Sequence, residues 1–591
     1  MSGGEGGYAW GPTIGIDGKT RFRLWAPAEK QVRLRIAGEN LPMARLGDGW
    51  FEAVIAAPPF GTQYGFVLDD GTFVPDPASR RQNDVLGPST LVDPSSFAWT
   101  DQAWKGRPWK ETVFQEIHIG TFTPEGTFRA AAAKLSELAD LGFTAIEVMP
   151  LAHFPGARGW GYDGVFHYAP YSPYGSADDF KAFVDTAHGL GLMVFMDVVY
   201  NHFGPVGNFL SVYAPDFFHT DNPTPWGPRI AFEREPVRRY FIDNAIYWLT
   251  EYHLDGLRLD AVDQIEDRSA AHILEQLSRE ARAAVTSRPV HLAVENPVNG
   301  TDLLAACEDG LRLYEADWND DFHHAIHAAV TEEKAGHYAR FAEDAWGNAA
   351  RALAQGYLSD GRRVLPIEPP PSETLPRTSF IQFLQNHDQV GNRAGGDRLH
   401  HGIDPALHAA LVEMLVLSPP IPMLFQGDDH LTSRPFRFFA DYEGKLREDY
   451  RKHREVEARN FGGLTEDMPL PRIFDPSEPA TFEACKLDWS EADRPEATRW
   501  RAFLKRLFRV RRERIVPLID DSLRGGDIEP APDRCIFVDW PSSRGVLKLR
   551  ANLSAAAVEL EPDMGEEIYP GSGAGGGRVL GPCGVRLYLA V

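Results

Sequence analysis

Four apolar segments of the chain each lead into residues whose side chains can carry out acid-base chemistry. Their polar residues are Asp197, Asn201 and His202; Arg258 and Asp260; Glu295; and His387 and Asp388. Two carboxyl groups that flank a glycosidic bond can divide the work, because one attacks the anomeric carbon as an anion while the other protonates the leaving oxygen. These residues therefore predict carboxylate-catalysed cleavage of a sugar bond.

The three acids differ in their sequence surroundings, which predicts different roles. Arg258 lies two residues before Asp260 on the same strand face, so its cation would favour the ionised carboxylate. Glu295 follows an apolar run without an adjacent cation, which favours its protonated form. We therefore expect Asp260 as the nucleophile, Glu295 as the general acid/base, and Asp388 beside His387 as an acid that binds sugar hydroxyls.

Alternating strands and helices are predicted to position these side chains. The expected strands are Val113–Ile119, Thr144–Val148, Leu192–Val199, Gly256–Asp260, His291–Glu295, Leu311–Glu315, Phe380–Leu384 and Pro422–Phe425. They are apolar on both faces, as parallel strands between helices must be. About eight such units favour a (β/α)8 barrel, a TIM barrel, in which catalytic groups lie at the carboxyl ends of the strands. A doubly wound sheet is disfavoured, since no GxGxxG follows the first strand.

Both ends of the chain are predicted to form smaller β-domains. Residues 1–103 contain short alternating strands such as Arg21–Trp25 and glycine turns, which predict a β-sandwich. Residues 104–519 would form the catalytic barrel with its insertions, including a helix over Phe128–Leu141 and a helix capped by Ser176. Residues 520–591 return to short strands and predict a C-terminal β-domain.

Composition and charge exclude several classes of partner. The 60 basic and 84 acidic residues give a formal charge of −24, which disfavours nucleic acid and acidic lipid as partners. The N-terminus lacks the basic and apolar regions of a signal peptide, and no apolar run reaches the roughly 18 residues that span a bilayer. The four cysteines show no CxxC spacing. We therefore expect a cytoplasmic protein without a membrane segment.

Four segments resemble, in order, the signature regions of the α-amylase superfamily. They are Asp197–Gly204 (DVVYNHFG), Gly256–Val262 (GLRLDAV), Ala293–Asn296 (AVEN) and Gln385–Gln389 (QNHDQ). The resemblance implies a (β/α)8 barrel and retention of the anomeric configuration. By position it implies the nucleophile Asp260, the acid/base Glu295 and the third acid Asp388. It also implies that the sugar site before the cleaved bond is lined by Arg258, His202 and His387.

Other stretches resemble the maltooligosyltrehalose trehalohydrolase family in particular. They are Asp76–Arg80, Glu116–Phe128, Gly159–Tyr174, Asp320–His327 and Gln385–Leu399. This resemblance implies hydrolysis of the α-1,4 bond next to a terminal trehalose unit, and a maltooligosyltrehalose synthase as a partner in the same pathway. It further implies that Tyr162 stacks on a sugar ring, that Asp163 accepts from sugar hydroxyls, and that His324 donates to trehalose hydroxyls.

Two stretches depart from the family pattern. The usual Met-Gly-Glu-Glu after the last strand is here Gln426–Asp429 (QGDD), with shorter acidic side chains near the rim. Residues 296–299 (NPVN), directly after Glu295, also differ. Neither departure replaces one of the three acids, so both bear on the preferred substrate length.

Two alternative functions stay open at this point. A glucan branching or debranching enzyme of the same superfamily would share the N-terminal sandwich. A non-catalytic glucan-binding protein belongs to another class, and the three intact acids argue against it. No cofactor is expected.

No metal is expected either. Asp197 and Asn201 could hold calcium, but a role in holding the loop that carries His202 is favoured. His323 and His327 have the i, i+4 spacing of metal ligands, although a surface or loop-lining helix is the favoured interpretation.

Overall fold

The computed structural model describes residues 7–221, 223–462, 474–562, 564–571 and 577–591. The chain divides into two compact units. The first contains residues 1–106, 126–133 and 148–292, and the second contains residues 107–125, 134–147 and 293–591. Within the described ranges, no helix has both the length and the apolar character that crossing a bilayer requires.

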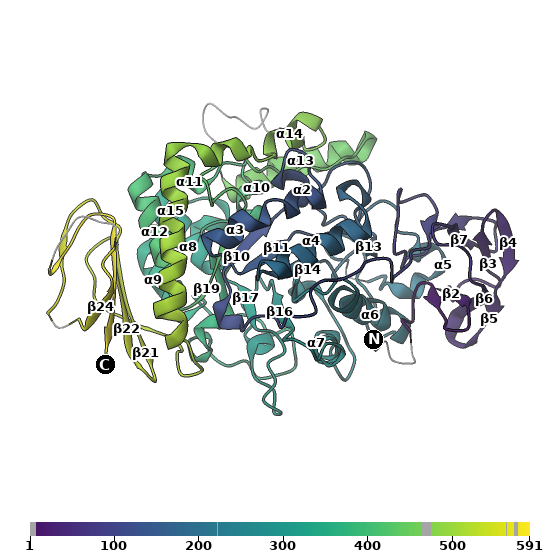
Figure 1. Cartoon of the computed structure of the whole chain (residues 1–591), viewed down its shortest axis with the longest axis horizontal. Coiled ribbons are helices and arrows are strands. Elements are labelled where there is room, and N and C mark those ends of the chain that lie inside the picture. Colours follow the sequence, from purple (N-terminus) through teal and green to yellow (C-terminus); the bar gives the residue numbers. More distant parts are fainter. Residues whose placement is uncertain (1–6, 222, 463–473, 563, 572–576) are drawn as a thin grey trace. The chain divides into compact units, whose positions relative to one another are not determined.

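Eight parallel strands close into a barrel, which confirms the predicted TIM-barrel fold (Figure 1). In barrel order they are β10 (Phe114–Ile117), β11 (Ala145–Val148), β14 (Met193–Val198), β15 (Gly256–Leu259), β16 (His291–Val294), β17 (Ala316–Trp318), β18 (Phe380–Phe383) and β19 (Ile421–Phe425). Every residue of these strands is buried. Such burial is typical of parallel strands that are covered on both faces.

The strand predicted at Leu311–Glu315 is wrong, because the sixth barrel strand is β17, which begins only at Ala316. In β17, Ala316 pairs with Ala293 of β16, and Asp317 pairs with Phe380 of β18. A barrel strand must hydrogen-bond to a neighbouring strand on each side. The three residues of β17 meet this requirement, although they are less apolar than the residues before them. Periodicity alone does not carry that information.

Helices follow most of the strands. They include α2 (Phe128–Ala132), α3 (Leu135–Leu141), α4 (Ala177–Gly189), α6 (Glu235–Glu251), α7 (Ile273–Ala284), α8 (Asp320–Thr331), α9 (Ala345–Gln355), α12 (Pro405–Leu417), α13 (Gly444–Phe461) and α15 (Pro495–Val510). The helix predicted over Phe128–Leu141 is divided into α2 and α3. The cap predicted at Ser176 is confirmed, since its hydroxyl accepts from the Asp179 amide and the Asp179 carboxylate accepts from the Ser176 amide.

The N-terminal segment forms two antiparallel sheets, as the alternating pattern predicts. One sheet has the order β1 (Thr13–Ile14), β2 (Lys19–Trp25), β6 (Trp50–Ala56), β5 (Ala44–Arg45). The other has the order β4 (Glu39–Pro42), β3 (Arg33–Ile36), β7 (Gln63–Val67), β8 (Phe73–Val74), with β9 (Ser89–Thr90) paired to β7. Phe22, Leu24, Leu34 and Phe66 are fully buried there.

Arg80 connects this segment to the barrel residues of the same unit. Its guanidinium lies over the rings of Tyr8, Tyr168 and Tyr247, at 5.1, 4.1 and 4.4 Å from their centroids. Tyr168 belongs to β13 (Phe166–Pro170), and Tyr247 belongs to α6. Three cation–π contacts in a buried setting fix the end of the N-terminal segment against these two elements.

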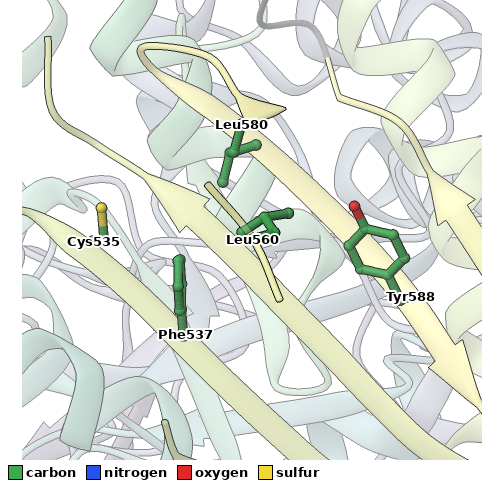
Figure 2. Packing of buried hydrophobic residues seen from close by; sticks show 5 residues of the cluster. All are labelled: Cys535, Phe537, Leu560, Leu580 and Tyr588. Carbon is green, nitrogen blue, oxygen red and sulfur yellow. The ribbon is translucent and has the colours of Figure 1, made fainter. Parts of the chain in front are cut away.

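The C-terminal segment forms a five-stranded antiparallel sheet in the order β20 (Asp527–Ile528), β21 (Cys535–Ser542), β22 (Gly545–Asn552), β26 (Gly584–Ala590), β24 (Glu566–Tyr569). A second pair, β23 (Val558–Glu559) and β25 (Val579–Leu580), lies beside it. Figure 2 shows one cluster of buried residues in this segment, made of Cys535, Phe537, Leu560, Leu580 and Tyr588. The antiparallel sheets at both ends of the chain agree with the two predicted flanking β-domains, whereas their exact boundaries stay a prediction.

Candidate active site

Asp260 directly follows β15 and is held by an ion network within the first unit. Its backbone N–H donates to Val198 of β14 at 3.1 Å, which continues the strand pairing to this residue. Arg258 Nη1 lies 3.1 Å from Asp260 Oδ1 and 2.5 Å from Asp197 Oδ2. All three side chains are largely or fully buried, so the one guanidinium compensates two carboxylates that water hardly reaches.

The backbone turns sharply after this nucleophile candidate. Ala261 adopts a left-handed conformation with a φ of 39°, which a residue with a Cβ adopts only at a cost of roughly 1–2 kcal/mol. The turn comes directly after Asp260, whose side chain therefore stands at the carboxyl end of β15. The predicted pairing of Arg258 with Asp260 on one strand face is confirmed.

Asn201 connects Asp260 to His202. Its amide nitrogen donates to both the backbone carbonyl and Oδ2 of Asp260, each at 2.8 Å, while its amide oxygen contacts His202 Nδ1. His202 Nε2 faces the carbonyl of Tyr162 at 3.1 Å. Burial lowers the pKa of His202 to about 4, against the charge of Asp163 and the Tyr162 carbonyl, which both raise it. Asn201 thus contacts His202, whose loop it was expected to hold, and also Asp260, which was not expected.

The loop after β11 supplies two further side chains that the resemblance implies. The Tyr162 hydroxyl donates to Asp197 Oδ2 at 2.7 Å, and the partly exposed Tyr162 ring lies edge-on to the buried ring of Trp160. Asp163 is partly exposed and close enough to influence the His202 imidazole. The structure therefore brings the five site residues predicted in the first unit into one connected group: Asp260, Arg258, His202, Tyr162 and Asp163.

Trp226 is a candidate that sequence reasoning missed. Its ring is stacked on His202, with centroids 5.1 Å apart and planes 21° apart, and half of the residue is exposed. An exposed indole beside a predicted sugar site offers a flat apolar face. The only signal in the sequence is a tryptophan in a proline-rich loop, which does not distinguish such a platform from ordinary packing.

Glu295 directly follows β16, in the second unit, and the loop behind it is anchored by Asp317 of β17. Asp317 accepts from the Asn296 backbone N–H at 3.0 Å and from the Tyr357 hydroxyl at 2.5 Å. Burial raises the pKa of Asp317 well above its ordinary value, and the nearby charge of Glu295 adds to this rise. Asp317, which sequence reasoning left outside the site, is a fully buried support for the backbone after Glu295.

His387 begins the short helix α10 (His387–Gly391), in the second unit, and is bound by Glu116 of β10. Glu116 Oε2 accepts from the His387 backbone N–H at 2.9 Å, and Oε1 accepts from Nδ1 at 2.5 Å. Both side chains are almost completely buried. Because Nδ1 is bound to this carboxylate, Nε2 is the ring nitrogen with which His387 could meet a sugar hydroxyl.

Asp388 is the next residue of α10. The helix is capped by Asn386, whose side-chain oxygen accepts from the backbone N–H groups of Asp388 and Gln389. Asn392, one turn later, donates from Nδ2 to Asp388 Oδ1 at 2.5 Å. The cap fixes the backbone of this acid, and Asn392 fixes its carboxylate.

The stretch Gln426–Asp429, which departs from the family pattern, forms hydrogen bonds with other residues inside the protein. Gln426 accepts from the His118 backbone N–H at 2.8 Å and donates to the Thr121 hydroxyl at 2.8 Å. Asp428 accepts from Arg398 at 3.1 Å and from Gln385 at 2.7 Å, and burial raises its pKa to about 6. The shorter acids are thus buried among neighbouring loops.

A surface or loop-lining helix was expected for the α8 histidines, and the surface position is wrong, because His323, His324 and His327 are all buried. Packing of α8 against the helical turn η7 (Gly336–Phe341) removes this face from solvent: His327 stacks on Tyr338, and His324 stacks on Phe341. Burial lowers the pKa of His324 to about 3. Its ring therefore stays neutral at neutral pH, and both of its ring nitrogens are enclosed.

In the part of the chain that the structure describes, no group of three or more histidine, cysteine, aspartate or glutamate side chains has the arrangement of a metal site. Asp197 and Asn201, the pair considered for calcium, are bound to Arg258, Tyr162, Asp260 and His202 as described above.

Known proteins are similar to this chain over most of its length. The model of the family "Alpha amylase, catalytic domain" matches residues 91–221. A Deinococcus radiodurans protein named malto-oligosyltrehalose trehalohydrolase is 43% identical over 84% of this chain and 81% of its own length. A protein of the same name from Arthrobacter ramosus is 37% identical over 95% of this chain and 98% of its own length.

A solved structure extends the match to the whole fold. A Salmonella typhimurium protein assigned to the alpha amylases superposes with a TM-score of 0.92 at 44% identity, covering 99% of this chain and all of that one. Together with the two sequence relatives, this similarity spans the barrel and both flanking β-regions. The chain belongs to the malto-oligosyltrehalose trehalohydrolase family of glycosidases, within the α-amylase superfamily.

Proposed function

We propose that this enzyme hydrolyses the α-1,4 bond next to the terminal trehalose unit of maltooligosyltrehalose and releases trehalose. The observation that carries the proposal is the way Asp260 is held. One carboxylate oxygen faces Arg258 and the other accepts from Asn201, at the carboxyl end of a barrel strand. A carboxylate bound by a cation and an amide donor is kept ionised and oriented, as a nucleophile requires.

The three acids would act in two steps. Asp260 attacks the anomeric carbon of the glucose before trehalose, while Glu295 protonates the departing oxygen of trehalose. Water then attacks the glycosyl-enzyme, with Glu295 now accepting the proton, and the shortened maltooligosaccharide leaves. Asp388 would bind hydroxyls of the reacting glucose and favour its oxocarbenium-like form. Attack from opposite faces in the two steps retains the α configuration.

The remaining site residues would bind the sugar ring before the cleaved bond. Arg258 keeps Asp260 charged, Tyr162 and Trp226 offer aromatic faces, and His202 contacts both of these residues. Three more binding residues belong to the proposal, namely Asp163, His387 and His324. His324 would act on the trehalose side only if its enclosed ring becomes accessible when substrate binds.

Product analysis tests this proposal directly. The purified protein is incubated with maltotriosyltrehalose, and the products are separated by anion-exchange chromatography. Equimolar trehalose and maltotriose are expected, and proton NMR in the first minutes should show the α anomer of maltotriose. Free glucose, a β anomer, or untouched substrate would contradict the proposal.

The branching alternative is tested with the same protein and linear amylose. One relative, a Streptomyces avermitilis 1,4-alpha-glucan branching enzyme, is 36% identical over 41% of this chain. This similarity is the reason to test for branching activity. New α-1,6 bonds in the amylose, without trehalose from the first substrate, would favour branching. Tight glucan binding without turnover of either substrate would favour a binding protein.

The cellular setting is part of the proposal. A cytoplasmic enzyme would act after a maltooligosyltrehalose synthase, which converts the reducing end of an α-glucan into a trehalose unit. We propose this synthase as a functional partner, with no nucleic-acid or membrane partner. The formal charge of −24 supports the last two points, since polyanions and acidic lipid surfaces would be repelled.

A further inference from the structure

We propose that Arg454 is a positioning residue for the reaction, which acts on Asp388 through Asn392. Arg454 belongs to α13, a helix that follows the last barrel strand and carries none of the predicted site residues. The inference rests on the proposed role of Asp388 as the third catalytic acid. It adds a residue that neither the motifs nor the resemblance pointed to.

The contact runs through a single amide. Arg454 Nη1 donates to Asn392 Oδ1 at 2.5 Å, and Asn392 Nδ2 donates to Asp388 Oδ1 at 2.5 Å. Arg454 Nη2 also donates to the backbone carbonyls of Gly391 and Asn392, at 3.1 and 2.9 Å. The guanidinium thus binds both the side chain and the backbone at the end of α10.

Arg454 decides which way the Asn392 amide points. The two ends of an amide group have nearly the same shape, so packing alone leaves two orientations open. A guanidinium can only donate, and it therefore draws the amide oxygen toward itself. The NH2 group must then face Asp388, where it is the donor that a carboxylate needs. Without Arg454, the amide oxygen could rotate toward Asp388 and repel it.

Arg454 also acts on Asp388 through its positive charge. Arg454 is 5% exposed, and its guanidinium lies 5.2 Å from the ring centroid of Phe438, whose backbone N–H donates to Gly391. Burial lowers the pKa of Arg454 to about 10, so it stays charged at neutral pH. With the neutral Asn392 between them, Arg454 favours the ionised form of Asp388 without forming a direct ion pair with it.

The test compares three single variants with a matched control. Arg454→Met keeps an unbranched apolar stem and removes the donors, Arg454→Lys keeps the charge, and Asn392→Ala breaks the connection. The control is Arg451→Ala on the same helix, whose side chain is 52% exposed and pairs with Glu455 at 3.6 Å. Thermal unfolding of each variant shows whether it is folded. If Arg454→Met does not fold, Arg454→Lys and Asn392→Ala still test the proposal.

The expected result is a loss in kcat with little change in KM. A misplaced catalytic group costs up to about 100-fold, so we expect kcat to fall roughly 10- to 100-fold in Arg454→Met and Asn392→Ala. KM should stay within about threefold, Arg454→Lys should lie between wild type and Arg454→Met, and Arg451→Ala should match wild type. Equal rates for Arg454→Met and Arg451→Ala would overturn the proposal.

Double variants separate this role from general stabilisation. If Arg454 acts through Asn392, the double variant Arg454→Met with Asn392→Ala should be no slower than the slower single variant. In an Asp388→Asn background, Asn392→Ala should change the remaining rate less than about twofold. Multiplied losses in either combination would show independent effects and overturn the proposal.

Two substrates keep this proposal distinct from the proposed function. All rates are measured on maltotriosyltrehalose and on maltohexaose. A wild-type enzyme that cleaves maltohexaose but releases no trehalose would contradict the proposed function, while the Arg454 comparison on maltohexaose would still support or overturn the positioning role. A wild-type protein that cleaves neither substrate would overturn both.

Discussion

Asn201 donates from one amide nitrogen to two oxygens of Asp260, the backbone carbonyl and Oδ2, each at 2.8 Å. Arg258 faces the other carboxylate oxygen at 3.1 Å, so each oxygen of the proposed nucleophile has a defined donor. The backbone contact matters as much as the carboxylate contact, because it ties the end of β15 to the loop after β14. Asn201 therefore sets both the position of Asp260 and the rotation of its carboxylate.

Replacing Asn201 with alanine should slow catalysis while the fold stays intact. A hydrogen bond to a charged group contributes about 1.5–3 kcal/mol, so kcat/KM should fall roughly 10- to 150-fold. Steady-state kinetics on maltotriosyltrehalose measure the loss, and circular dichroism checks the fold. A rate within twofold of wild type would show that Arg258 alone is sufficient to orient Asp260.

Replacing Glu295 with glutamine should remove the proton donor and spare the nucleophile. Loss of general acid/base catalysis costs about 10²- to 10⁴-fold on a natural sugar leaving group. An aryl α-maltoside with an acidic phenol needs no proton to depart, so its first step should be affected far less, and a burst of phenol should precede a slow steady state. Asp260→Asn is the matched control and should show no burst on either substrate.

His188 should make the stability of the first unit depend on pH. It lies on α4 with its side chain fully buried; Nδ1 faces Asp101 at 2.9 Å, and Nε2 faces Asp255 at 3.0 Å. Burial alone would lower the pKa of His188, but hydrogen bonds and charges from both aspartates outweigh it and raise the pKa above the ordinary value. A carboxylate at each ring nitrogen favours the imidazolium form.

The sign of this effect follows from the raised pKa. Stabilisation by His188 is fully present below the unfolded pKa of about 6.5 and is lost as the pH rises through the folded pKa. The Tm deficit of His188→Gln relative to wild type should therefore be largest near pH 5.5 and shrink by pH 9. His453→Gln, with a side chain 65% exposed, is the control. A deficit that stays constant over this range would contradict the charged form.

Replacing Trp226 with alanine should weaken substrate binding more than turnover. An aromatic stacking contact contributes about 0.5–1.5 kcal/mol, which corresponds to a rise in KM of about 2- to 10-fold with kcat changed less. Phe60→Ala changes an equally exposed aromatic in the loop between β6 and β7, and it should leave both constants unchanged. A fall in kcat without a change in KM would instead assign Trp226 to the support of His202.

Sequence reasoning predicted the part of the fold that local chemistry determines. Seven of the eight expected strands overlap barrel strands, because a fully buried strand requires a continuous apolar run. The contact of Arg258 with Asp260 was also predictable, since two residues that are two apart on a strand share a face. The same holds for the capping box at Ser176, whose partner is three residues away.

The features of the fold and the site that sequence reasoning did not predict depend on contacts between segments that are far apart in the sequence. His387 is bound by Glu116, which lies 271 positions earlier, and Asn392 is bound by Arg454, 62 positions later. The α8 histidines are buried by η7, whose position no local pattern indicates. Strand β17 was placed wrongly for the same reason, because its bounds are set by the registers of its two neighbours.

The cluster of tyrosines around Arg80 has a consequence for how the first unit unfolds. Arg80 and Tyr8 come from the N-terminal segment, whereas Tyr168 and Tyr247 come from barrel elements, so the contacts of Arg80 with Tyr168 and Tyr247 are lost if the segment detaches. Cutting the chain before residue 104 would leave two tyrosine faces bare and remove the cation between them. The sandwich is therefore no removable accessory: it should melt together with the barrel elements of its unit in one cooperative transition.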